Sequence, residues 1–435
     1  MNLRRVINAS ILVGIFFGLD KIIALGRQVL VGRAYGVRAA LDAYNAANNL
    51  PDGIAAVIFG SALTMAFIPI LAQTFDHDGR AVAWDLFSRV ANWAFVLTAG
   101  LGLLIVIFAD PLVRYVVVPK FAPEQQALTA SIMRLDVIAL LIFSISGTII
   151  SGLQAQQHFL LPALAPVLYN VGQIIGVVFL SKWFGIYGLV YGVILGAALH
   201  LAIQVPGLLR FGFRWTPALD WRNDKVRQVA QLMIPRLLTV AVIQFIFVAT
   251  DNFASGVGEG AVTAILYGWT IMQLPETVIG TAVGTALLPT LSELAARGDS
   301  ASLRRLLWRA IAALLALTLP ATVVSLVVLR PVVRLVFEGR NFTPQATQLV
   351  VAAAQMFLLG VAGQSLVETA VRTFYARKDA LIPLIAAVIT AALFVGLCLV
   401  LIGPLGHVGI ALANTLAFSF EAVFLLFVLW RQKVL

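Results

Sequence analysis

One stretch of the chain occurs twice, and this repeat limits the possible folds more than any other feature. Gly60–Pro69, GSALTMAFIP, recurs as Gly280–Pro289, GTAVGTALLP, 220 residues later. A second match keeps almost the same spacing, because FLLP at 159–162 is followed 221 residues later by ALIP at 380–383. Equal offsets at well-separated places indicate that the chain contains two copies of one unit.

The segments between polar residues are long and apolar. The chain has 435 residues, of which 61% are hydrophobic and 11% are charged, whereas soluble domains contain about 25% charged residues. Lipid must therefore solvate much of the surface. The runs lack the period-two alternation of barrel strands, so we predict helices. About twelve spans are expected, at 8–35, 41–74, 86–109, 129–153, 160–181, 186–208, 229–256, 262–292, 305–329, 346–375, 381–402 and 407–430.

The repeat and the spans together predict the fold class. Six spans in each half is an even number, so both halves would enter the membrane from the same side. We expect an all-α integral membrane protein with two six-helix lobes, related as parallel repeats about an axis along the membrane normal. The predicted lobes are residues 1–210 and 229–435. A cytoplasmic linker, 211–228, would place Trp215 and Trp221 near the headgroups.

The net charge of +10 is explained by membrane topology. If the N-terminus is cytoplasmic, the inside segments carry 19 Lys and Arg residues and the outside segments carry seven. This positive-inside bias predicts that both termini are cytoplasmic, and it leaves no signal for nucleic-acid binding. One cysteine and four scattered histidines give no metal-site spacing, and no nucleophile constellation occurs. We predict a transporter, with no metal site and no catalytic residues.

Charged residues stand inside the first expected span. Lys21 and Arg27 lie too deep for easy snorkelling to the inner face, and such charges are usually functional. The alternative is that Asp20 neutralises Lys21 and that Arg27 and Arg33 snorkel outward. The first interpretation predicts a basic lining for a polar cargo.

A polar stripe runs along the second expected span. Its members have spacings of 3, 3, 1 and 3, which place them on one face of a helix. Such a face should line a hydrated cavity, or else hold helices together by hydrogen bonds. The stripe consists of Asp42, Asn45, Asn48, Asn49 and Asp52.

The second half carries acidic residues in its spans. Asp251 lies deep in the seventh span and Glu276 follows Pro275 in the eighth. A carboxylate at such a depth can bind sodium or a proton, so Asp251 is the candidate for ion coupling. The alternative is a structural pairing of Asp251 with Asn252 or with a backbone group. Glu368 and Arg372, four residues apart, are expected to pair.

Several motifs, in order along nearly the whole chain, resemble those of the MurJ/MviN lipid II flippases. They are GRQVLVGRAYG at 26–36, Asp42-Ala43, Leu50-Pro51, AFIP at 66–69, SGLQAQQHFLLPALAP at 151–166, Leu274-Pro275, GTALLP at 284–289, RTFYARKD at 372–379 and PLGHVG at 404–409.

The resemblance implies the multidrug/oligosaccharidyl-lipid/polysaccharide exporter fold, in which two lobes rock about a central cavity. It implies that Lys21 and Arg27 contact the pyrophosphate of a lipid-linked peptidoglycan precursor. Asp42 matches the family's aspartate at the start of span two. Asp251 resembles a sodium-site carboxylate, and Thr415 matches one further ligand of that site.

The chain also departs from the family pattern. Ala55 and Thr270 stand where arginines of the family align, and span eleven lacks the Asn/Asp pair that completes the sodium site in some relatives. About twelve spans are predicted, whereas well-known members carry fourteen.

We therefore expect a flippase that moves lipid II from the inner to the outer leaflet by alternating access for cell-wall synthesis. No cofactor is expected beyond a coupling ion, Na⁺ or H⁺. The partners would be an undecaprenyl-pyrophosphate-type lipid and membrane lipids, and the location the bacterial inner membrane. The alternatives are a flippase for another polyprenyl-linked oligosaccharide, and a cation-coupled multidrug exporter that uses Asp251 and Glu276.

Overall fold

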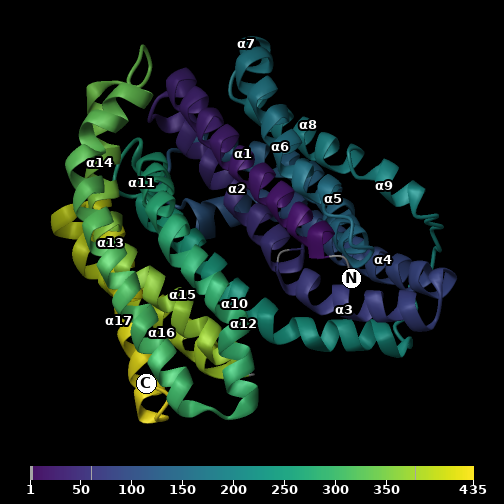
Figure 1. The fold of residues 1–435 in the computed structure, drawn as a ribbon. Coiled ribbons are helices and arrows are strands. Elements are labelled where there is room, and N and C mark those ends of the chain that lie inside the picture. The colour runs from purple at the N-terminus through teal and green to yellow at the C-terminus, as the bar shows by residue number, and fades with distance from the viewer. Residues whose placement is uncertain (1–2, 60, 378) are drawn as a thin grey trace. The chain divides into compact units, whose positions relative to one another are not determined.

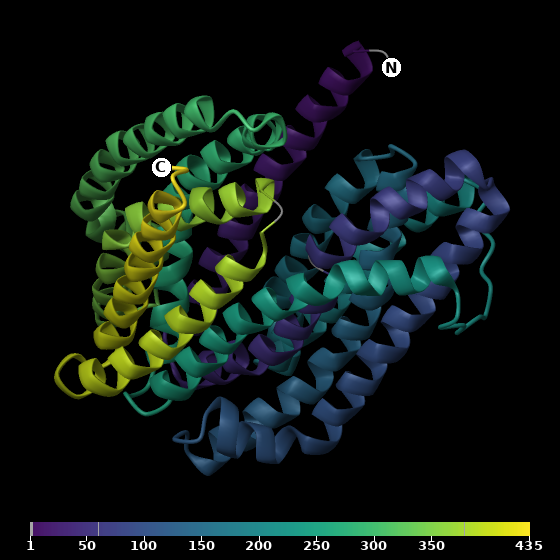
Figure 2. The same cartoon turned by 90° about the horizontal axis from the view of Figure 1, so that it is seen from below.

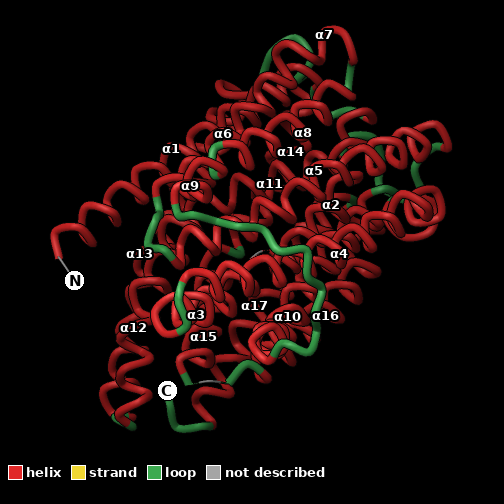
Figure 3. The backbone as a smooth tube through the Cα atoms, turned by 90° about the vertical axis from the view of Figure 1, so that its right-hand side faces the viewer, coloured by secondary structure: helices red, strands yellow, loops and turns green. Residues whose placement is uncertain are grey.

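The computed structural model describes residues 3–59, 61–377 and 379–435, without the side chains of residues 3–15, 17, 61, 62, 65, 235 and 236. Gly60, where the repeated stretch begins, lies outside the described residues. All regular secondary structure in the described part is helical, as Figure 3 shows. The predicted all-α membrane fold is confirmed, because the long apolar runs form long helices.

The chain packs into two compact units, which are described separately. Unit 1 consists of Met1–Tyr35, Ala43–Val116 and Ala122–Ala241, and unit 2 consists of Gly36–Asp42, Val117–Phe121 and Val242–Leu435. The last boundary between them, after Ala241, falls inside the helix α10 (Asp224–Ala254). The lobes predicted from the sequence repeat, 1–210 and 229–435, are a different division of the chain from these packing units. They stay a prediction.

Unit 1 contains the helices of the first half and the start of the second (Figure 1). Its core is built around Phe67, Trp84 and Phe87, whose rings contact one another. The helices are α1 (Leu3–Tyr35), α2 (Ala39–Phe59) from Ala43 on, α3 (Ser61–His77), α4 (Arg80–Leu112), η1 (Val113–Val117), α5 (Pro123–Ala155), α6 (Leu160–Ile175), η2 (Gly176–Leu180), α7 (Ser181–Phe184), α8 (Tyr187–Ala202), α9 (Val205–Arg210) and the first part of α10 (Asp224–Ala254).

Glycines allow α6 and α8 to approach closely. A Cβ atom on Gly192 would lie 2.7 Å from the Cα atom of Gly176, and one on Gly172 would meet the backbone of Gly196. Backbones can come this near only where small residues face each other. The Gly192-x-x-x-Gly196 pattern is therefore a helix-packing motif.

The segment between α9 and α10 is fastened to α4. The Asn92 amide donates to the carbonyls of Thr216 and Ala218 at 2.8 and 3.0 Å, and the Trp215 indole donates back to Asn92 at 2.9 Å. Arg89 pairs with Asp220 at 3.3 Å. These bonds explain why the predicted linker, 211–228, belongs to unit 1. Its last residues are already helical, because α10 begins at Asp224.

Unit 2 has its own core, built around Leu291, Phe374 and Leu425. Figure 2 shows α16 and α17 lying against each other within it. Its helices are the rest of α10, α11 (Ala261–Glu276), η3 (Thr277–Thr281), α12 (Ala282–Arg297), α13 (Ser300–Phe337), α14 (Pro344–Leu359), α15 (Val361–Ala376), α16 (Leu381–Leu405) and α17 (His407–Arg431), together with the first residues of α2.

Many helices are long and apolar enough to cross a membrane. There are nine among the described residues, and ten if α14 and α15, bent by 47° at their junction, form one span. The expected first and second spans include side chains that the structure does not describe. The total of about twelve spans therefore stays a prediction.

Candidate functional site

Unit 1 holds a cluster of polar side chains inside its membrane helices. α1 and α6 are joined by two hydrogen bonds: Asn170 donates to Asp20 at 2.8 Å, and the Arg27 guanidinium donates to the Gln173 carbonyl at 2.5 Å. Asn170 and Gln173 are both buried. They are three residues apart, so they share one face of α6.

α2 and α5 contribute acidic and phenolic groups to the same cluster. Arg27 interacts electrostatically with Asp52, Tyr44 and Tyr169. Asp136 on α5, only 2% exposed, interacts with Asp52. We call this set the polar cluster: Asp20, Arg27, Tyr44, Asn48, Asp52, Asp136, Tyr169, Asn170 and Gln173.

Three buried atoms of the polar cluster have no hydrogen-bond partner in the described part of the chain. They are Oδ1 of Asn48, Oδ1 of Asp136 and Nε2 of Gln173. Leaving a buried polar group unpaired costs roughly 1–3 kcal/mol, so such atoms are rare without a reason. Two acceptors and one donor in this set are therefore open to a ligand.

The predicted polar stripe of α2 is divided between different roles. Asp52 is exposed and belongs to the polar cluster, as does the half-buried Asn48, while Asn45 and Asn49 are half-buried on the same helix. Asp42 is fully buried and lies in unit 2. The helical spacing predicted a shared face, but it could not show that the first turn of α2 packs separately.

Asp42 caps a helix of unit 2. Its two carboxylate oxygens accept the backbone N–H groups of Gly260, at 2.6 Å, and Thr263, at 2.8 Å, at the start of α11. Glu259 accepts the N–H of Ala39 at 3.1 Å at the start of α2. Each helix thus receives a carboxylate at its N-terminus, where unpaired N–H groups and the helix dipole favour negative charge.

The remaining predicted residues stand on four different helices, α1, α10, α11 and α17. Lys21 is exposed on α1, and Asp251 is buried near the end of α10. Thr415 donates to the carbonyl of Met356 at 2.8 Å. Glu276 accepts a hydrogen bond from Thr281 at 3.3 Å. The predicted roles of these residues in cargo or ion binding stay predictions.

Two acidic residues and one arginine gather around η3 and α15. Arg372 pairs with Glu368 at 2.6 Å, as their spacing predicted, and both interact electrostatically with Glu276. The pair leaves the carboxylate of Glu276 beside a second acidic group. No group of three or more His, Cys, Asp or Glu suited to a metal ion occurs in the described part of the chain.

The sequence prediction missed five members of the polar cluster: Tyr44, Asp136, Tyr169, Asn170 and Gln173. Asp136 stands within an expected span, so the rule that intramembrane charges are usually functional would have found it. Asn170 and Gln173 give a weaker signal, because amides also serve as hydrogen-bond glue between helices. Only the folded chain shows that they face Asp20 and Arg27.

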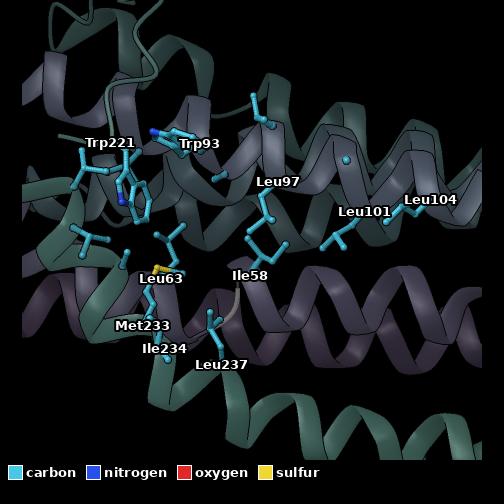
Figure 4. Close-up of a pocket in the computed structure, with 17 residues that line it drawn as sticks. Ile58, Leu63, Trp93, Leu97, Leu101, Leu104, Trp221, Met233, Ile234 and Leu237 are labelled. Atoms are coloured by element: carbon cyan, nitrogen blue, oxygen red, sulfur yellow. The ribbon is translucent and has the colours of Figure 1, made fainter. Parts of the chain in front are cut away.

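Unit 1 also contains an apolar groove of about 790 Å³. Figure 4 shows Trp93 and Trp221 toward one end and Leu101 and Leu104 toward the other. The two indole rings contact each other edge to face at 5.4 Å. The other lining residues come from α2, α3, α4 and the first part of α10: Ile58, Leu63, Val90, Ala94, Val96, Leu97, Gly100, Val226, Val229, Ala230, Met233, Ile234 and Leu237.

The arrangement of helices is that of a known class of membrane transporters. An inward closed structure of the lipid II flippase MurJ superposes with a TM-score of 0.85, covering 98% of this chain and 89% of that one at 23% identity. An inward-facing multidrug resistance MATE family transporter of the MOP superfamily superposes with a TM-score of 0.77, covering 95% and 94% at 16% identity. The fold is therefore that of the MOP superfamily of transporters.

The sequence comparison is more specific. A profile of the family "Lipid II flippase MurJ" matches residues 31–435, and the chain belongs to this family. The lipid II flippase MurJ of Burkholderia cenocepacia is 28% identical over 424 residues, covering 95% of this chain and 81% of that protein. A probable lipid II flippase MurJ of Rhizobium meliloti is 29% identical over 419 residues, covering 93% and 77%.

Proposed function

We propose that this protein carries lipid II across the membrane, from the inner to the outer leaflet, by alternating access. The family and the fold support this function. The observation that carries it in the structure is the pair of Arg27 and Gln173, which offers hydrogen-bond donors inside a membrane unit. The Gln173 amide has its Nε2 atom buried and unpaired within the described residues.

Such donors suit the diphosphate of a lipid-linked sugar. A diphosphate loses its water when it enters the membrane interior, at a large desolvation cost. Charge-assisted hydrogen bonds from a guanidinium replace part of that hydration, and the planar guanidinium matches phosphate oxygens well. Lys21, exposed on α1, adds a second cation on the helix that carries Arg27.

The apolar groove supports an amphiphilic cargo. α2 contributes Asn48 and Asp52 to the polar cluster and, about two turns further on, Ile58 to the groove. Trp93 and Leu104 are eleven residues apart on α4, which corresponds to about 16 Å of helix, or about half the thickness of the hydrocarbon core. The groove therefore accommodates a lipid tail along one leaflet while polar groups contact the headgroup.

The proposal extends to location, partner and coupling. The cargo would be an undecaprenyl-pyrophosphate-type lipid in the bacterial inner membrane, with both termini of this chain cytoplasmic. The coupling ion would be Na⁺ or H⁺ at Asp251, with Thr415 and Glu276 as further candidates. The membrane potential would also act on the basic side chains, by about 2.3 kcal/mol per charge per 100 mV.

Complementation tests this function in cells. Cells depleted of their own lipid II flippase should grow when they express the wild-type chain, and should not grow with the double variant Lys21→Ala and Arg27→Ala. Arg134→Ala is the matched control. Arg134 pairs at 2.6 Å with the exposed carboxylate of Asp110 on α4, so this variant removes a cation that is not a member of the polar cluster. Full growth of the double variant at equal expression would refute the cationic site.

Drug export is the alternative that an observation favours. Asp52 and Asp136 bring acidic charge into the polar cluster, and cationic compounds would bind to such groups. This alternative predicts that expression raises resistance to cationic dyes and that Asp52→Asn abolishes that resistance.

A flippase for another polyprenyl-linked oligosaccharide would use the same donors. Its test is a comparison of defined lipids in a flipping assay.

A further inference from the structure

Among the described residues, the carboxyl group of Asp136 forms no ion pair, and the charge that acts on it is another carboxylate. The side chain is 2% exposed, and its Oδ1 atom accepts no hydrogen bond from the described residues. The charged group that acts on it is the Asp52 carboxylate, which carries the same sign. An isolated buried carboxylate in a membrane helix is costly, so it needs a positive partner.

A second open acceptor lies on α2. Tyr44, Asn48 and Asp52 follow one another at intervals of four residues and share a face of α2. Asp136 interacts with both Tyr44 and Asp52, and Asn48 contacts the Tyr44 hydroxyl. Asn48 therefore lies on the same helix face as two residues that interact with Asp136, and its own Oδ1 atom is also buried without a hydrogen-bond partner in the described part of the chain.

The cation of the polar cluster, Arg27, has other partners among the described residues. Arg27 of α1 acts on Asp52 and donates to Gln173, and Tyr169 of α6 is a neutral phenol. On α4, Asp110 is paired with Arg134. His200 of α8 is hydrogen-bonded with Ser146 at 2.5 Å. Asp20 of α1, which is itself acidic, accepts a hydrogen bond from Asn170 at 2.8 Å.

We propose that Asp136 and Asn48, with Asp52 beside them, bind one small monovalent cation within unit 1. The ligand set consists of carboxylate and amide oxygens, which suit a hard ion. An alkali-metal ion would coordinate both open oxygens, and a proton on Asp136 would let that group donate a hydrogen bond to Asn48. The site is distinct from the predicted coupling residue Asp251, which belongs to unit 2.

The test uses the purified full chain without cargo, so its outcome is independent of lipid flipping. The unfolding temperature is measured as Na⁺ replaces N-methyl-D-glucamine at constant ionic strength and pH. We expect a saturable rise in the wild type, and at least a tenfold weaker apparent affinity in Asp136→Asn. The control Asp110→Asn removes an exposed carboxylate of unit 1 and should respond like the wild type. Asn48→Ala provides a second variant that keeps Asp136 and should weaken the response.

Infrared spectroscopy distinguishes the two sources of positive charge. If Na⁺ has no effect, a carboxylic acid C=O band that shifts in D₂O and disappears in Asp136→Asn identifies the ligand as a proton. A saturable Na⁺ response identifies it as an alkali-metal ion. The proposal is overturned if the wild type shows neither the Na⁺ response nor an Asp136-dependent band, because the carboxylate would then be ionised and unoccupied.

Discussion

Replacement of Asp42 by alanine removes both acceptors from the N-terminus of α11. The N–H groups of Gly260 and Thr263, which now donate at 2.6 and 2.8 Å to a buried carboxylate, would lose their partner. Loss of an N-cap costs about 0.5–2 kcal/mol, and a hydrogen bond to a charged group contributes about 1.5–3 kcal/mol. We expect a total destabilisation of about 2–4 kcal/mol, since water entering the truncated site compensates in part.

Thermal unfolding of the purified protein, followed by tryptophan fluorescence, measures this loss. For a unit of about 200 residues, in which 1 kcal/mol shifts Tm by about 2–4 °C, the expected decrease in Tm is roughly 4–16 °C. Asp42→Asn keeps one acceptor oxygen, so it should lose about half as much. The control Asp110→Ala breaks an exposed ion pair and should cost no more than about 1 kcal/mol.

The same variants separate a capping role from direct contact with the cargo. If Asp42 acts through the cap, lipid flipping in Asp42→Asn and Asp42→Ala should fall in the order of their stabilities. An unchanged Tm in Asp42→Ala together with lost flipping would refute the capping argument. It would support instead a role of Asp42 in the hydrated cavity that its place in the polar stripe predicts.

Three further predictions concern unit 1. Burial and then the charge of Arg210 hold the pKa of His158 below its ordinary value, so the unfolded chain binds that proton more tightly than the folded chain. The contribution of His158 to stability should be complete above about pH 6.5 and decrease below it. His158→Gln should therefore flatten a Tm profile measured between pH 7.5 and 5.5, and identical profiles for the variant and the wild type would contradict this. Gly192→Val should destabilise the folded protein by about 1–3 kcal/mol, because the added atoms meet the α6 backbone. Gly100→Val is the control, since a Cβ atom at Gly100 meets nothing within 4 Å. Equal Tm values for the two variants would contradict the packing argument. Gly100→Trp should fill the groove and slow the flipping of a long-chain lipid more than that of a short-chain analogue, and an equal effect on both would rule out a tail site there.

The fold could be predicted from the sequence because lipid leaves the backbone few options. Long apolar runs must become helices, and the repeat of Gly60–Pro69 at Gly280–Pro289 indicates two copies. The role of Gly192 in close packing was also predictable, since small residues four apart allow helices to approach. The membership of the segment before α10 in unit 1 was not predictable, because hydrogen bonds between Asn92 and residues near Trp215 join it to α4.

The candidate site was predictable only in part. Arg27 and Asp52 were found because a charge inside a span is costly wherever it points. Asp42 has the same sequence signal, but its carboxylate caps α11, a contact between residues 218 and 221 positions apart. Helical periodicity reports a face of one helix and carries no information about which distant segment packs against that face. Gln173 was missed for the converse reason, because its partner Arg27 is 146 residues away.

Transport of defined lipids by the purified chain tests the central claim most directly. The chain is reconstituted into vesicles that contain fluorescently labelled lipid II, and the fraction that reaches the other leaflet is followed over time. We expect the wild type to move lipid II well above the level in protein-free vesicles. Arg27→Ala should lower the rate about tenfold, which corresponds to about 1.4 kcal/mol. Arg134→Ala should leave the rate unchanged. If the folded wild-type protein leaves lipid II in place but moves a cationic dye or another lipid-linked oligosaccharide, lipid II is not its cargo.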